Sequence, residues 1–361
     1  MTSALEHAVF SAARTAGLFR LLRARHRREL LVLTYHSVVE ADASARERHP
    51  LVYRNAVSAE HFEAQMRHLR RHYHPLDGDD LRAVLDGAPL PEHAVLVTFD
   101  DGLLNNATVA LPRLRTLDVP AVFFLPTGFL DAAADGDRRL HWTEALVARL
   151  SSGDAEEAAL WGDVAARLPE LDTDLGALSP ARATLHVVDH LKSLSRAVRT
   201  DRLAVLQDLL PALDATDFPV DAAGHSVLST MTWDHARLAA DHGVSLGSHT
   251  VNHAILNRLP NDEAEAEITD SRDRIRAATG QPADLFAYPN GGAQDFGPMH
   301  QDMLVRAGYR GAFTQIAGFN DASTDPLRLR RIDVSGDYDL PTFCYFASGC
   351  KTAADRLRGR R

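Results

Sequence analysis

The sequence predicts an α/β fold built around a largely parallel sheet. The chain has 361 residues, which is long enough for one large α/β barrel or two domains. Hydrophobic residues make up 45% and charged residues 24%, the balance of a folded protein rather than a disordered one. Short apolar runs alternate with helical patterns along most of the chain, as they do in repeated βα units.

Seven apolar runs are predicted to be strands. Each is short and lies between helical patterns or turn residues, which is typical of buried strands in a parallel sheet. In chain order they are residues 30–36, 95–99, 121–125, 244–248, 285–288, 311–314 and 331–334.

Helix start and stop signals separate these strands. Ser58 precedes one helical pattern as a capping residue, and Asp262 opens another that closes at Gly280. A third helical pattern ends at Gly308. Connections of this kind allow successive strands to run parallel.

Residues 138–229 depart from the alternation of strands and helices. They contain Ala/Leu-rich helical stretches, one of them stopped by Pro211, and no convincing strand. We therefore predict an α/β domain over residues 29–346, interrupted by a helical insertion that caps one end. Residues 347–361 form a basic C-terminal tail, whose Arg-rich end, residues 356–361, is predicted to fray.

Residues 1–28 form the N-terminal segment, in which 3–28 are predicted to be an amphipathic helix with arginines away from its apolar side. The simpler interpretation is a helix packed on the domain, and the alternative is peripheral contact with an anionic membrane. The chain shows neither an apolar run of about 18 residues nor a secretory signal, so a cytoplasmic location, peripheral at the membrane in the alternative, is the default expectation. A net charge of -10 argues against a nucleic-acid partner, and no feature indicates an oligomeric state.

Two adjacent carboxylates, Asp100 and Asp101, end the predicted strand at 95–99. The carboxyl ends of parallel strands are where ligands bind. Adjacent residues there point in different directions, so one carboxylate can bind a metal while the other faces a substrate. A turn or a helix cap is the alternative role for such a pair.

Two histidines four residues apart, His249 and His253, follow the predicted strand at 244–248. The chain has 18 histidines, and this spacing also occurs by chance, as in His68 and His72. The position at a strand end distinguishes His249 and His253 from such chance pairs. One carboxylate and two imidazoles would leave open positions on a divalent metal ion, which catalysis requires.

Three motifs resemble those of the polysaccharide deacetylases, carbohydrate esterase family 4, in both their residues and their order along the chain. They are Phe-Asp-Asp-Gly at 99–102, Ser-His-Thr-x-x-His at 248–253 and Phe-Ala-Tyr-Pro-Asn-Gly at 286–291. The resemblance covers residues 30–346 apart from the insertion. It implies a distorted (β/α)7 barrel of the NodB type that removes N-acetyl groups from N-acetylhexosamine units of a polysaccharide or glycan precursor.

The resemblance also implies roles for individual residues. Asp101, His249 and His253 would be the ligands of a divalent metal, with Zn²⁺ the first expectation, and Asp100 would be the general base acting on the metal-bound water.

In the third motif, Tyr288, Pro289 and Asn290 would lie at the substrate, with the backbone N–H of Asn290 helping the metal to stabilise the oxyanion.

Two departures from the family pattern lead to further predictions. Ala287 stands where many members have an arginine that pairs with the catalytic aspartate, and Arg331 is our candidate replacement, with Arg330 as the alternative. The family's C-terminal histidine motif is not visible. His36, after the first strand, would take its place as general acid if the barrel is permuted, and its alternative role is structural.

Two other functions remain open. The same metal, base and oxyanion site would serve an amide or ester hydrolase with another acyl substrate. A catalytically weak carbohydrate-binding relative is the alternative from a different class, favoured by the missing arginine and histidine and disfavoured by the retained Asp100, Asp101 and both motif histidines.

Overall fold

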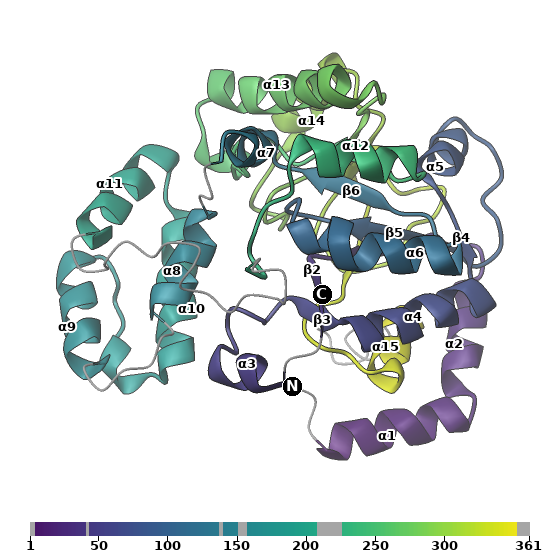
Figure 1. The fold of residues 1–361 in the computed structure, drawn as a ribbon, viewed down its shortest axis with the longest axis horizontal. Coiled ribbons are helices and arrows are strands. Elements are labelled where there is room, and N and C mark those ends of the chain that lie inside the picture. Colours follow the sequence, from purple (N-terminus) through teal and green to yellow (C-terminus); the bar gives the residue numbers. More distant parts are fainter. Residues whose placement is uncertain (1–3, 41–42, 137–139, 151–156, 208–225, 352–361) are drawn as a thin grey trace.

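A curled parallel sheet forms the centre of the computed structural model, which describes residues 4–40, 43–136, 140–150, 157–207 and 226–351 (Figure 1). Neighbouring strands along the sheet run in the order β10-β1-β5-β6-β7-β8-β9, and the short strand β4 also pairs with β5. Each of these pairings is parallel. The strands are β1 (Leu31–Tyr35), β4 (His74–Pro75), β5 (Ala94–Phe99), β6 (Val122–Leu125), β7 (Ser245–Ser248), β8 (Leu285–Ala287), β9 (Gly311–Phe313) and β10 (Ile332–Asp333). All seven predicted strands are present, and the predicted barrel class is confirmed.

The segment around β10 brings the two edges of the sheet together. Leu329 donates its N–H to Ala312 O at 2.8 Å and accepts from Thr314 N at 2.8 Å, beside β9. A few residues later, Ile332 pairs with Leu33 of β1. The sheet therefore curls into a distorted barrel in which β1 lies between β5 and β10.

Helices pack around the outside of the sheet. The helix cap predicted at Ser58 is present, because Ser58 Oγ accepts a hydrogen bond from His61 N at 3.4 Å. The helix predicted from Asp262 begins at Asn261 and ends, as predicted, at Gly280, whose φ is 73°. The helices are α4 (Ala59–His72), α5 (Gly78–Leu85), α6 (Leu111–Leu117), α7 (Thr127–Ala134), α12 (Trp233–Asp241), α13 (Asn261–Thr279), α14 (Pro298–Arg306) and α15 (Leu340–Ala347).

A second, two-stranded parallel sheet was not predicted. It pairs β2 (Ser37–Val39) with β3 (Ala56–Ser58), with α3 (Ala43–Arg48) between them in the chain. Three-residue strands are too short to show a periodic pattern. This sheet continues directly from His36, so it fixes the chain that leaves β1.

The N-terminal segment is two helices rather than the single one predicted. α1 (Ala4–Thr15) and α2 (Leu18–Arg25) are separated at Gly17, which has a φ of 77° that a continuous right-handed helix does not allow. Phe10 stacks on Tyr345 of α15 at a centroid distance of 4.2 Å, so the segment packs on the domain. Leu21 remains 70% exposed, and membrane contact through residues 3–28 stays a prediction. None of the described helices is long and apolar enough to cross a membrane.

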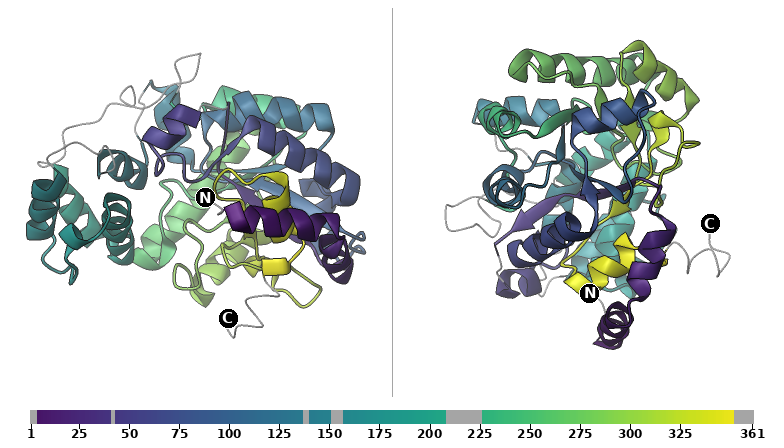
Figure 2. Two further views of the ribbon diagram at one scale, coloured as in Figure 1. Left: turned by 90° about the horizontal axis from the view of Figure 1, so that it is seen from below. Right: turned by 90° about the vertical axis from the view of Figure 1, so that its right-hand side faces the viewer.

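The insertion forms a lobe beside the barrel (Figures 1 and 2). Its described helices share an apolar core in which Val164, Val187 and Leu191 are fully buried and to which Leu51 of the barrel domain also belongs. These helices are α8 (Trp142–Leu150), α9 (Glu157–Arg167), α10 (Pro180–Ser193) and α11 (Arg196–Gln207). The insertion also contributes side chains to a cavity at the carboxyl ends of the strands. Pro211 and the tail from 352 onward lie outside the described residues.

Candidate metal centre

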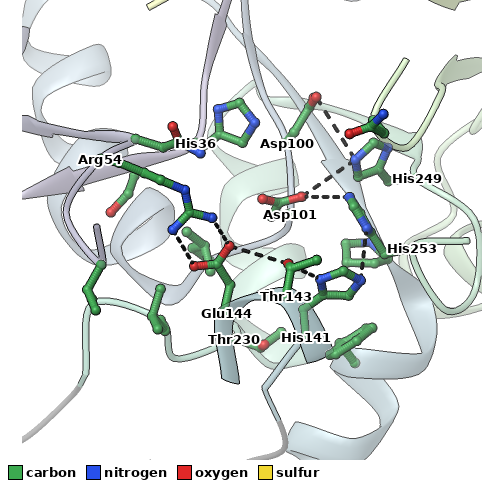
Figure 3. Close-up of a pocket in the computed structure, with 18 of the residues that line it drawn as sticks. His36, Arg54, Asp100, Asp101, His141, Thr143, Glu144, Thr230, His249 and His253 are labelled. Atoms are coloured by element: carbon green, nitrogen blue, oxygen red, sulfur yellow. Dashed lines mark hydrogen bonds and ion pairs between the residues drawn. The ribbon is translucent and has the colours of Figure 1, made fainter. Parts of the chain in front are cut away.

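A cavity of about 330 Å³ opens where β1, β5 and β7 end (Figure 3). His36, Asp100, Asp101, His249 and His253 all line it. Ligands bind at this end of the strands in parallel α/β folds. The structure thus brings together chemically reactive side chains that lie far apart along the chain.

The two carboxylates diverge because the backbone turns sharply after β5. Asp101 has a φ of 69° and Gly102 a φ of 59°, both in the left-handed region, which aspartate tolerates better than most residues and glycine tolerates freely. As a result, Asp100 is 2% exposed, whereas the Asp101 side chain is 34% exposed toward the cavity.

Asp101, His249 and His253 converge as a ligand set should. Asp101 Oδ1 lies 3.5 Å from His249 Nε2 and 3.2 Å from His253 Nε2, and one donor atom from each residue lies within 4.8 Å of the others. Tetrahedral zinc with bonds of about 2.0–2.1 Å places its ligands about 3.3 Å apart. Within the described part of the chain, no other group of three or more such residues meets this condition. The residues therefore fit a divalent metal.

The tautomer of His249 supports the same interpretation. Its Nδ1 donates to Ala287 O at 2.7 Å, which places a proton on Nδ1 and directs Nε2 toward Asp101. Metal-binding histidines almost always have such a partner for the second ring nitrogen. The backbone carbonyl at the end of β8 therefore orients this imidazole toward the metal position.

Charges around the cavity favour the metal-binding forms of Asp101 and His253 but not that of His249. Burial raises the pKa of Asp101, but hydrogen bonding to both imidazoles outweighs burial and holds this pKa well below its usual range. Burial lowers the pKa of His253. Burial lowers the pKa of His249 too, but the carboxylates of Asp100 and Asp101 outweigh burial and the net pKa is raised. An ionised carboxylate and a neutral imidazole are the states in which these groups act as ligands.

Arg331, not Arg330, pairs with Asp100. Its Nη1 and Nη2 donate to the two Asp100 oxygens at 2.8 and 2.7 Å, and its Nε donates to Thr314 O at 2.8 Å. Arg330 is exposed. Burial raises the pKa of Asp100, but the Arg331 guanidinium outweighs burial and the net pKa is lowered. Asp100 is therefore ionised near neutral pH, as a general base must be.

His36 faces the same cavity from the end of β1. Its Nδ1 lies 3.8 Å from Asp333 Oδ1, beyond hydrogen-bond distance, and neither atom has another partner among the described residues. The side chain is 16% exposed. The position is compatible with proton transfer to a molecule in the cavity, and the role stays a prediction.

The third motif is divided between the cavity and the core. Asn290 lines the cavity with a φ of 61°, and its side chain bridges Lys192 Nζ at 3.1 Å and Asp295 Oδ2 at 2.6 Å. Tyr288 is 1% exposed and donates its hydroxyl to Leu327 O at 3.0 Å. Tyr288 therefore supports the loop from behind the cavity rather than lining it, and Pro289 is absent from the cavity lining as well.

Several residues that line the cavity were missed by the sequence analysis. Arg54 lies in the turn just before β3, and four further residues come from the insertion: His141, Thr143, Glu144 and Lys192. His141 Nε2 lies 3.2 Å from His253 Nδ1. No local motif surrounds these side chains, so no signal in the sequence distinguishes them from surface residues.

Part of the chain matches a known protein family. Residues 201–311 match the polysaccharide deacetylase family model, a segment that holds His249, His253 and Asn290. A search of curated proteins found no match. The Asp100 and Asp101 pair lies before the matched segment, on the other side of the insertion.

Three solved structures are similar to this chain, and two of them are deacetylases by name. PplD from Streptococcus pyogenes, in complex with acetate, has a TM-score of 0.56 and 17% identity, over 88% of this chain and 98% of that one. IcaB from Ammonifex degensii has a TM-score of 0.52 and 18% identity, over 89% and 97%. A de-N-acetylase from Aggregatibacter actinomycetemcomitans has a TM-score of 0.53 and 17% identity, over 88% and 99%. At these identities the likeness establishes a shared fold.

Proposed function

We propose that this chain is a polysaccharide deacetylase, a hydrolase of amide bonds. Its reaction would remove N-acetyl groups from N-acetylhexosamine units of a polysaccharide or glycan precursor. The reaction would depend on a divalent metal, with Zn²⁺ our first choice. The observation that carries the proposal is the convergence of Asp101, His249 and His253 beside an ionised, buried Asp100.

Asp101, His249 and His253 would hold the metal, which would polarise the acyl carbonyl and acidify water. Asp100 would accept a proton from the attacking water. Its two oxygens each accept one hydrogen bond from Arg331. An ionised carboxylate has about four acceptor sites, so Asp100 can still accept a hydrogen bond from the attacking water. The fixed guanidinium holds the carboxylate in one orientation throughout.

Asn290 and His36 would complete the reaction. Asn290 lines the cavity and its backbone has a left-handed conformation. Its backbone N–H would donate to the developing oxyanion. The leaving amine needs a proton, because an amide nitrogen is a poor leaving group until it is protonated. His36 is the histidine on the β1 side of the cavity that would supply this proton.

Replacing His36 with Ala is expected to lower kcat for acetate release by about 10²–10⁴-fold while the bound metal is retained, because only the proton donor is removed. His36→Gln keeps a polar side chain but cannot transfer the proton, and should lose as much. Turnover and metal content are measured on the same samples. Turnover at the wild-type rate in His36→Ala would remove this residue from the mechanism.

Metal removal tests the proposal as a whole. Dialysis against a chelator should abolish acetate release from N-acetylglucosamine oligomers, and added Zn²⁺ should restore it. Asp101→Ala should neither retain metal nor recover activity. Full activity in the metal-free protein would contradict the metal dependence.

The same assay separates the competing functions. A metal-loaded protein that binds the oligomers without releasing acetate would be the weak carbohydrate-binding relative. Faster release of another acyl group would identify a different substrate. The buried pair of Asp100 and Arg331 favours an enzyme, since it supplies the charge that the third motif lacks at Ala287.

A further inference from the structure

The insertion contributes a histidine that contacts one of the proposed metal ligands. We infer that His141 is a positioning residue, which orients His253 and fixes its tautomer for metal binding through a hydrogen-bonded chain that runs from the lobe into the barrel. The inference rests on the metal centre proposed above. It gives the helical insertion a part in building the site.

The geometry places His141 behind the ligand rather than among the ligands. His253 Nε2 faces Asp101 Oδ1 at 3.2 Å, whereas its Nδ1, across the ring, faces His141 Nε2 at 3.2 Å (Figure 3). The two rings are nearly perpendicular, at 74°, with centroids 4.4 Å apart. His141 therefore contacts the ring nitrogen that a metal held with Asp101 would leave free.

Metal binding through Nε2 allows one arrangement of protons along the chain. His253 must carry its proton on Nδ1, so His141 Nε2 must accept it. His141 then carries its own proton on Nδ1, which donates to Thr143 Oγ1 at 2.6 Å. The Thr143 hydroxyl in turn donates to Glu144 Oε1 at 3.5 Å, a long contact.

The chain ends on a carboxylate that the barrel domain holds in place. Arg54, near β3, pairs with both oxygens of Glu144, one of them at 3.1 Å, and donates to Leu51 O at 2.7 Å. Thr143 is 5% exposed. The last acceptor in the chain is thus fixed from outside the insertion, so the order of donors and acceptors has a defined direction.

The two histidine ligands are therefore oriented by different means. A backbone carbonyl of the barrel, Ala287 O, orients His249, whereas a side chain of the lobe orients His253. A backbone partner survives any side-chain substitution. The His253 partner does not, and metal affinity should depend on His141.

Metal binding, rather than turnover, tests this inference. Zn²⁺ affinity is measured by competition with a chromophoric chelator on the full chain, and the visible spectrum of the Co²⁺ form reports ligand geometry. His141→Ala should bind Zn²⁺ about 10–100-fold more weakly, the usual effect of losing such a partner, and should shift the Co²⁺ spectrum. Thr143→Val should weaken binding by less.

The conservative variant separates orientation from folding. The Gln side-chain carbonyl can accept the His253 Nδ1 proton, so His141→Gln should recover much of the affinity and the wild-type Co²⁺ spectrum. His242→Ala, an exposed histidine after α12, is the matched control and should bind as the wild type does.

Wild-type affinity and spectrum in His141→Ala would overturn the inference and leave the proposed function standing. Equal losses in the Ala and Gln variants would also overturn it. A wild-type protein that binds no divalent metal would overturn the metal centre itself, together with this inference.

Discussion

Replacing Asp100 with Asn is expected to lower the rate of acetate release from N-acetylglucosamine oligomers by about 10²–10⁴-fold, with the metal still bound. The amide has nearly the shape of the carboxylate but cannot accept the proton of the attacking water. Asp101 Oδ1, His249 and His253 are untouched, so the ligand set persists. The measurement pairs initial rates of acetate release with metal content for each preparation.

The control for this variant is Asp234→Asn, at an exposed aspartate in the first turn of α12. It should leave both rate and metal content unchanged. An Asp100→Asn protein as active as the wild type would show that Asp100 is not the base. Loss of metal along with activity would instead place Asp100 in the ligand set.

Replacing Arg331 with Met is expected to lower the free energy of unfolding by about 3–5 kcal/mol and to reduce acetate release as well. Arg331 and Asp100 are 0% and 2% exposed, so the substitution leaves a carboxylate buried without its cation. It also removes the donor to Thr314 O. Urea unfolding, monitored by circular dichroism, measures the change.

A double variant separates the ion pair from general damage to the core. Asp100→Asn combined with Arg331→Met should be less destabilised than the sum of the two single variants, since no unpaired charge stays buried. Arg330→Met, at the exposed neighbouring position, should change stability by no more than about 0.5 kcal/mol. Strict additivity would mean that the pair contributes no coupling energy.

The strands of the barrel could be predicted because burial on both faces makes each one a short apolar run. β1 and β5 are buried at every position. β2 and β3 escaped prediction because three residues show no periodicity. The break at Gly17 escaped because a helical pattern continues on both sides, and glycine within such a pattern is tolerated.

The sequence alone determined the candidate ligands and the candidate base, because each pair is local: Asp100 and Asp101 are adjacent, and His249 and His253 lie four residues apart after a strand. Tertiary structure decided between Arg330 and Arg331. Consecutive residues entering a strand face opposite sides, so the register of β10 against β1 sends Arg331 inward and Arg330 outward. The partner of His253 was likewise decided by tertiary structure, because His141 precedes it by 112 residues and meets it only where the lobe joins the barrel.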